Sequence, residues 1–129
     1  METIRRMQKR IGAALILIGH DMGLMAQFVD KVAVTYAGRL VEISGVRETF
    51  TKPLHPYARA LISSLPSLEN KGVFQGIPGL APSLLRLPGG CAFHPRCARV
   101  MDACRTQIPP LETHDDGRRV ACHLYTRKP

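Results

Sequence analysis

A short, uninterrupted apolar run near the N-terminus, Ala13–Ile18, constrains the fold of this chain more than any other feature. The run contains β-branched residues and is too short to cross a membrane, which favours a strand buried on both faces. Such strands occur mostly in parallel sheets covered by helices. Gly19 ends the run, and His20 and Asp21 follow at once. In open α/β sheets ligands bind beyond the carboxyl ends of strands, so His20 stands where chemistry usually takes place.

A structural role for His20 is the alternative, and the residues alone favour it slightly. The imidazole would then cap the next helix or satisfy a buried backbone group. The flanking segments are predicted to be helical: Glu2–Ile11 is amphipathic with Gly12 as its stop, and Asp21 can cap a helix at Met22–Phe28. The order helix, apolar strand, helix predicts an α/β fold with a layered sheet.

The next segment predicts a β-hairpin and two helices. Lys31–Tyr36 and Arg39–Ile43 are rich in strand-forming residues and are separated only by Ala-Gly, which is typical of a tight hairpin turn. Val46–Phe50 predicts one short helical turn. Tyr57–Leu65 predicts a helix, with Pro56 in its first turn and Pro66 as its stop.

Composition sets the class of protein. The 129 residues are 45% hydrophobic and 22% charged, as in one ordinary globular domain. The basic start followed by an apolar run imitates a secretory signal, but Glu2 and the His-Asp ending argue against one, so the cysteines are expected to be cytosolic thiols. The net charge of +8 raises the possibility of nucleic-acid binding, yet the basic residues are scattered and aromatic residues are few.

The second half of the chain is rich in proline and glycine and contains all four cysteines, Cys91, Cys97, Cys104 and Cys122. A loop-rich segment with four cytosolic thiols is more often held by a metal than by disulfides. The gaps match neither common zinc pairs nor common ferredoxin spacings, so the spacing alone predicts a tetrathiolate site for an unspecified metal. The alternative is four independent buried thiols. His94, His114 and His123 could each replace a cysteine as ligand, although a surface position is the simpler expectation.

Several motifs together resemble one family. They are Leu-Ile-Leu-Ile-Gly-His-Asp at 15–21, Asp-Lys-Val-Ala-Val-Thr-Tyr-Ala-Gly-Arg-Leu-Val-Glu at 30–42, His-Pro-Tyr-Ala-Arg-Ala-Leu at 55–61, Ile-Pro-Gly at 77–79, Pro-Ser-Leu at 82–84, Gly-Cys-Ala-Phe-His-Pro-Arg-Cys at 90–97 and Val-Ala-Cys-His at 120–123. This set resembles the C-terminal part of the ATP-binding subunits of ABC importers for oligopeptides, dipeptides or nickel. The likeness covers nearly the whole chain.

The resemblance implies a fold class and two parts. Residues 1–52 are expected to be the C-terminal part of an ABC nucleotide-binding domain, a partial P-loop NTPase sheet with the strand before His20, a helix and the hairpin. Residues 53–129 are expected to be the family's loop-rich, cysteine-clamped extension. The sequence contains no Gly-x-x-x-x-Gly-Lys-Ser/Thr loop, signature or Walker B segment, so these residues alone are not expected to hydrolyse ATP.

The resemblance also implies site residues. His20 would be the switch histidine, which contacts the γ-phosphate of ATP and positions the attacking water, with ATP and Mg²⁺ bound by the parent subunit. Gly19 stands where the family usually has Thr or Ser, which would loosen the end of the strand. Cys91, Cys97, Cys104 and Cys122 would bind a [4Fe–4S] cluster, with zinc as the second choice, and the bound group would hold the extension together rather than transfer electrons.

The implied partners are a second ATPase subunit, two membrane permeases and an extracytoplasmic peptide-binding protein, with the chain at the cytoplasmic face of the inner membrane. Nucleic acid is not among them. Two other classes remain as alternatives: a small basic, metal-clamped nucleic-acid-binding module, and a stand-alone redox protein. The first requires salt-sensitive nucleic-acid binding and zinc, and the second requires a cluster that cycles reversibly.

Overall fold

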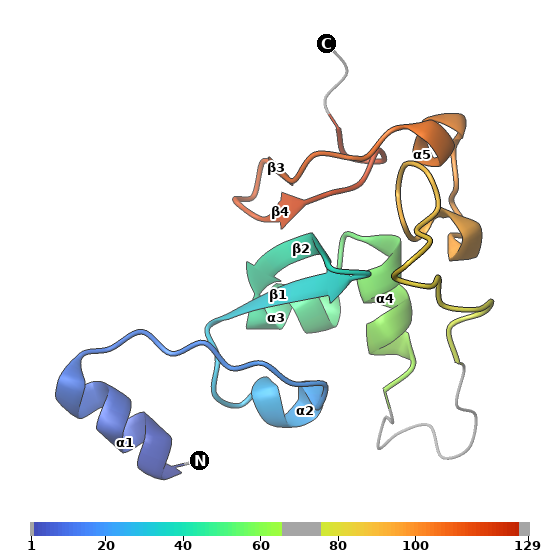
Figure 1. The fold of residues 1–129 in the computed structure, drawn as a ribbon. Coiled ribbons are helices and arrows are strands. Elements are labelled where there is room, and N and C mark those ends of the chain that lie inside the picture. The colour runs from blue at the N-terminus through green and yellow to red at the C-terminus, as the bar shows by residue number, and fades with distance from the viewer. Residues whose placement is uncertain (1, 66–75, 127–129) are drawn as a thin grey trace.

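The predicted hairpin lies at the centre of the structure. The computed structural model describes residues 2–65 and 76–126, and in it β1 (Lys31–Tyr36) pairs antiparallel with β2 (Arg39–Gly45) (Figure 1). The connecting Ala37 and Gly38 both have positive φ, 48° and 77°. This pair of left-handed residues is typical of a type I′ turn, whose twist matches that of the strands. The hairpin prediction is confirmed.

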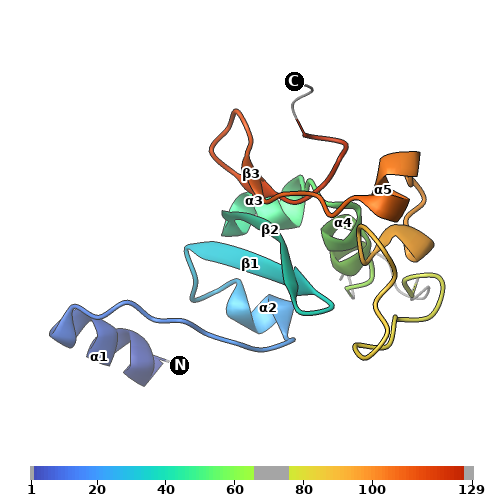
Figure 2. The same cartoon turned by 45° about the horizontal axis from the view of Figure 1, so that its top comes forward.

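Two short strands near the C-terminus extend the hairpin into a four-stranded sheet. β3 (Glu112–Thr113) and β4 (Arg119–Val120) pair with each other, and β4 also pairs with β2, which gives the order β1-β2-β4-β3. Every pairing is antiparallel. Figure 2 shows the two C-terminal strands beside β2. The chain therefore has a small mixed α/β fold in which the first and last thirds share one sheet.

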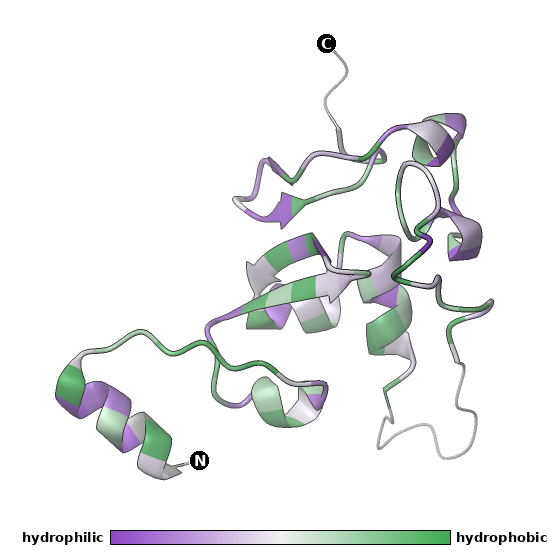
Figure 3. Cartoon of the chain, in the orientation of Figure 1, coloured by the Kyte–Doolittle hydropathy of each residue, from purple (hydrophilic) through white to green (hydrophobic). Residues whose placement is uncertain are grey.

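The prediction of a buried strand at Ala13–Ile18 is wrong for this structure. These residues form no helix or strand, and Ile16 and Ile18 are 86% and 92% exposed. Figure 3 shows the segment between the first two helices as a largely hydrophobic stretch that runs apart from the sheet. A strand buried on both faces needs neighbouring strands and covering helices, and the described residues supply neither at this position.

The helices match the predictions more closely. α1 (Glu2–Ile11) has the predicted bounds and is followed by Gly12 at φ 63°, a left-handed C-terminal stop. α2 (Met22–Met25) is shorter than predicted. α3 (Val46–Thr51) extends the predicted turn by one residue. α4 (Pro56–Ser63) begins at the predicted proline, and the predicted stop, Pro66, lies outside the described residues.

Two short helices follow in the loop-rich half, η1 (His94–Arg96) and α5 (Asp102–Thr106). An aromatic cluster joins this half to the hairpin: the ring centroids of Tyr36 and Tyr57 lie 4.5 Å apart, and that of Phe93 lies 5.2 Å from Tyr36. Within the described ranges no helix has the length and apolar character needed to span a membrane. The core thus lies where the hairpin, α4 and the loop around Phe93 meet.

Candidate functional site

His20 lies between the irregular apolar segment and α2. Its side chain is exposed. Asp21, the next residue, caps α2 because its carboxylate accepts the backbone N–H of Leu24 at 2.9 Å. The predicted capping role of Asp21 is confirmed. Because Asp21 caps α2, this contact gives no support to the alternative that His20 caps the helix. The cavity described next is lined by other residues, so the structure keeps His20 apart from the cysteines.

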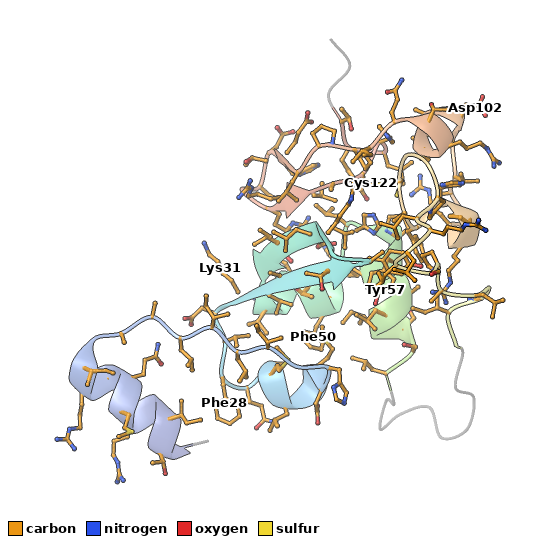
Figure 4. The ribbon with its side chains drawn as sticks, in the orientation of Figure 1. Phe28, Lys31, Phe50, Tyr57, Asp102 and Cys122 are labelled. Atoms are coloured by element: carbon orange, nitrogen blue, oxygen red, sulfur yellow. The ribbon has the colours of Figure 1, made fainter. Side chains whose placement is uncertain are left out.

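The four cysteines do come together. All four line one small cavity of ≈ 10 Å³, although they are separated in sequence and come from four different local structures. Figure 4 shows Cys122 where the β3–β4 strands meet the loops that carry the other cysteines, with Asp102 marking α5 nearby. All four are free thiols; Cys104 and Cys122 are buried, and Cys91 and Cys97 are half-buried.

Close backbone contact holds three of these cysteines in place. The N–H of Cys91 donates to the carbonyl of Cys104 at 2.8 Å, which joins the loop before η1 to α5. Gly90 makes this approach possible: its φ is 65°, and an added Cβ would clash with the Cys104 carbonyl. Cys97 ends η1, and its N–H donates to the His94 carbonyl at 3.2 Å.

Strand pairing supplies the fourth cysteine. Val120 lies opposite Glu42 on β2, and the Ala121 N–H donates to the Val41 carbonyl at 2.9 Å. These bonds fix β4 beside the hairpin and deliver Cys122, the next residue, to the cavity. The sheet therefore positions Cys122 relative to the three cysteines of the preceding loops.

Burial favours the protonated form of three of the thiols. It raises the pKa of Cys91 and Cys97 and raises that of Cys122 to about 11. Backbone N–H groups act in the opposite direction: those of Phe93, Arg99 and Leu124 lower the pKa values of Cys91, Cys97 and Cys122, respectively. Such N–H bonds to sulfur stabilise thiolates once the protons are lost.

The donor set fits a thiolate-bound group in kind, since four thiols line one cavity. In residues 2–65 and 76–126, however, no three His, Cys, Asp or Glu side chains converge tightly enough to hold a metal ion. Ligation would therefore require the cysteine side chains to close on the bound group.

The candidate histidines separate into two groups. His94 and His123 line the cysteine cavity, where the Nδ1 of His94 lies 2.9 Å from the Cys91 carbonyl oxygen. His114 lies elsewhere, with its Nδ1 3.4 Å from an Asp116 carboxylate oxygen and its ring against Tyr125. Of the three candidate histidines, two therefore lie beside the cysteines and one does not.

Sequence reasoning missed two buried polar residues: His55, which lines the cavity, and Glu42, which holds the backbone of His55 in place. Glu42 is fully buried, and its carboxylate accepts the N–H groups of Leu54 at 2.9 Å and His55 at 2.7 Å. His55 is also buried and lines the cavity, and its Nδ1 accepts the Tyr57 N–H at 3.0 Å. Burial lowers the pKa of His55 to about 4, so this ring is neutral. The sequence does contain a signal for this buried polar cluster. Glu42 and Ser44 are two positions apart in an apolar strand, so their side chains lie on the same face.

Comparison with known proteins places the chain. The family model "Oligopeptide/dipeptide transporter, C-terminal region" matches residues 41–104, which run from β2 to Cys104. The chain is 44% identical over 126 residues to the probable peptide ABC transporter ATP-binding protein y4tS of Sinorhizobium fredii, covering 96% of this chain and 36% of that protein. It is 42% identical over 123 residues to the oligopeptide transport ATP-binding protein OppD of Salmonella typhimurium, covering 95% of this chain and 36% of OppD.

A third relative, the dipeptide transport ATP-binding protein DppD of Caldanaerobacter subterraneus, is 40% identical over 126 residues, which cover 97% of this chain and 39% of that protein. The similarity is to the ATP-binding subunits of ABC transporters. The chain belongs to the oligopeptide/dipeptide transporter family and contains its C-terminal region. It spans little more than a third of the length of these relatives.

Proposed function

We propose that this chain works as the C-terminal part of the ATP-binding subunit of an ABC importer for dipeptides or oligopeptides. One observation carries the proposal: similarity to peptide-transport ATP-binding proteins extends over 95–97% of the chain, well beyond residues 41–104. Hydrolysis of ATP with Mg²⁺ belongs to the complete subunit, because phosphate binding requires a P-loop that these residues do not contain.

His20 is the residue proposed to take part in the chemistry. A neutral imidazole can donate a hydrogen bond from one nitrogen to a phosphate oxygen while the other nitrogen accepts from water. The Asp21 cap fixes the start of α2 directly after His20 and so limits where the imidazole can lie. The exposed position of His20 leaves it accessible to a nucleotide bound by another part of the subunit.

Cys91, Cys97, Cys104 and Cys122 are the proposed ligands of a [4Fe–4S] cluster, with zinc as the alternative. Their common cavity supports this assignment, as do the backbone N–H groups that lower the pKa values of Cys91, Cys97 and Cys122. The bound group supplies crosslinks rather than electron transfer, because its binding energy becomes folding energy for a segment with little core of its own. The cysteines bind, and the sheet, Gly90 and the contact between Glu42 and His55 orient them.

The proposed division is residues 1–52 as nucleotide-binding-domain sequence and 53–129 as the extension. The pairing of β2 with β4 joins the two parts through one sheet. In the assembled importer the proposed partners are a second ATP-binding subunit, two permeases and an extracytoplasmic peptide-binding protein. The corresponding location is the cytoplasmic face of the inner membrane.

A chimera tests this function directly. The C-terminal segment of Salmonella OppD is replaced by this chain, and ATP-dependent oligopeptide uptake is measured in cells that lack their own subunit. Uptake is expected for the chimera, and His20→Ala should reduce it about a hundredfold. Gln27→Ala, an exposed change just after α2, is the matched control and should leave uptake unchanged. A chimera that assembles with the permeases but transports no peptide would overturn the proposal.

A further inference from the structure

One exposed arginine, Arg99, lies at the rim of the cysteine cavity. Apart from the thiols and apolar groups, its lining consists of His55, His94, Arg99 and His123, and no acidic side chain of the described ranges contributes to it. Arg99 is the one residue of this set with a permanent charge.

Arg99 is tied to the site twice. It lines the cavity with the four thiols, and its backbone N–H and its guanidinium charge both lower the pKa of Cys97 against the larger, opposite effect of burial. In the part of the chain that the structure describes, this guanidinium has no hydrogen-bond or ion-pair partner. Arg96 differs, because its guanidinium is held by the Ile77 and Pro78 carbonyls at 2.8 Å and 2.9 Å.

Four thiolates around Zn²⁺ or around an iron–sulfur core carry a net negative charge, whereas four thiols carry none. A cation at the rim therefore favours the ligated state over the metal-free state. We propose that Arg99 stabilises the anionic assembly that Cys91, Cys97, Cys104 and Cys122 form around a metal or cluster, a role that rests on the thiolate site proposed above. Arg99 acts as a positioning and charge-balancing residue and is not itself a ligand.

Arg105 provides a matched control. It is also an exposed arginine beside a cysteine, since it follows Cys104 directly in α5. It does not line the cavity. If only the net charge of the chain mattered, Arg99→Gln and Arg105→Gln would behave alike.

The experiment measures release of the bound group from the purified chain. Protein is prepared without oxygen, either loaded with zinc or reconstituted with iron and sulfide, and a chelator is added. Zinc release is followed with a colorimetric indicator and cluster loss by visible absorbance, with circular dichroism as a check on folding. Arg99→Gln should release the group about fivefold faster than the native chain, the size of effect expected of a partly exposed charge pair. Arg105→Gln should match the native chain, and Arg99→Lys should restore most of the retention.

Salt distinguishes charge from packing. At about 1 M salt, where screening acts over about 3 Å, the Arg99→Gln and native rates should converge. Equal rates for Arg99→Gln and the native chain at low salt would overturn this inference while leaving the thiolate site in place. A native chain that binds neither zinc nor iron would overturn both proposals. A faster release by Arg99→Gln that persists at high salt would show a packing effect and so contradict the inference.

Discussion

The Glu42 carboxylate accepts the backbone N–H of His55 at 2.7 Å, and both side chains are buried, at 0% and 1% exposure. This contact joins the hairpin to the loop that begins α4. Because β2 also carries β4 and His55 lines the cysteine cavity, one carboxylate connects the sheet to two walls of the candidate site. The polar contact explains how a segment with few apolar residues is held against the hairpin.

Glu42→Gln should therefore destabilise the fold. The N–H groups of Leu54 and His55 both donate to Oε2, while Oε1 accepts from the Leu54 N–H and the Ser44 hydroxyl. An amide has one acceptor oxygen where the carboxylate has two, so its NH₂ group must face buried donors on one side. An unsatisfied buried donor costs about 1–3 kcal/mol. Urea denaturation followed by circular dichroism measures the change. Glu48→Gln, an exposed substitution in α3, should differ little from the native chain, and equal midpoints for the two variants would contradict this account.

Acid should weaken the fold through His55. Burial lowers its pKa from 6.5 to about 4, so the unfolded chain binds more protons than the folded chain between these values. Stability due to neutral His55 is complete above pH 6.5 and is lost as pH falls toward 4, by about 3 kcal/mol in total. Urea titrations at pH 7 and pH 5 measure the loss. His55→Asn retains a capping side chain but not the titration, so its stability should change less between the two pH values. An identical loss in both proteins would exclude His55 as the cause.

Gly90→Ala should disrupt the cysteine cavity. The new Cβ would meet the carbonyl carbon of Arg105 and the amide nitrogen of Thr106, each at 2.8 Å, besides the Cys104 carbonyl, and backbone atoms cannot move aside cheaply. Gly117→Ala is the control, because Gly117 also has a positive φ, 81°, but open space around its Cβ position. The control should cost about 1 kcal/mol from backbone strain alone, and Gly90→Ala considerably more. Thermal melting compares them; equal melting temperatures would show that the close approach does not exist.

The sequence allowed the hairpin and helices to be predicted because their signals are local. Ala-Gly at a tight turn, Gly12 after α1 and Pro56 at the start of α4 each act within a few residues. The prediction for Ala13–Ile18 required strands and helices at other positions, which the described residues do not contain, and the segment is left irregular and exposed.

The site was predictable only in part, because several of its contacts join residues that are far apart in the chain. The four cysteines were expected to gather, and they line one cavity. Their spacing could not reveal that β4 delivers Cys122 by pairing with β2, or that Glu42 holds His55 in the cavity wall, because these contacts join residues far apart in the chain. In the sequence, Glu42 stands out only as the last residue of the family motif at 30–42.

Metal binding should depend steeply on pH. Burial raises the pKa of Cys122 to about 11 and raises those of Cys91 and Cys97, so a metal must displace protons from thiols. Apparent zinc affinity is expected to rise from pH 6 to pH 8. Cys122→Ser should reduce both the affinity and the steepness with which the affinity rises with pH. Competition with a zinc indicator in the absence of oxygen measures this. An affinity that does not change with pH would indicate that fewer thiols take part.

The apolar segment before His20 gives the sharpest contrast between the chain alone and the complete subunit. Ile16 and Ile18 are almost fully exposed, so Ile16→Ser with Ile18→Ser removes no buried surface and should leave the melting temperature of this chain unchanged. Val34→Ala, in the core, should cost about 1–3 kcal/mol and lower it. In the OppD chimera the same double serine variant should abolish uptake if this segment forms a buried strand in the complete domain, as the proposed assignment of residues 1–52 requires. In the melting experiment, a double variant that melts like Val34→Ala would show that the segment already packs against the hairpin. In the uptake experiment, full uptake by the serine chimera would show that the segment remains exposed in the subunit.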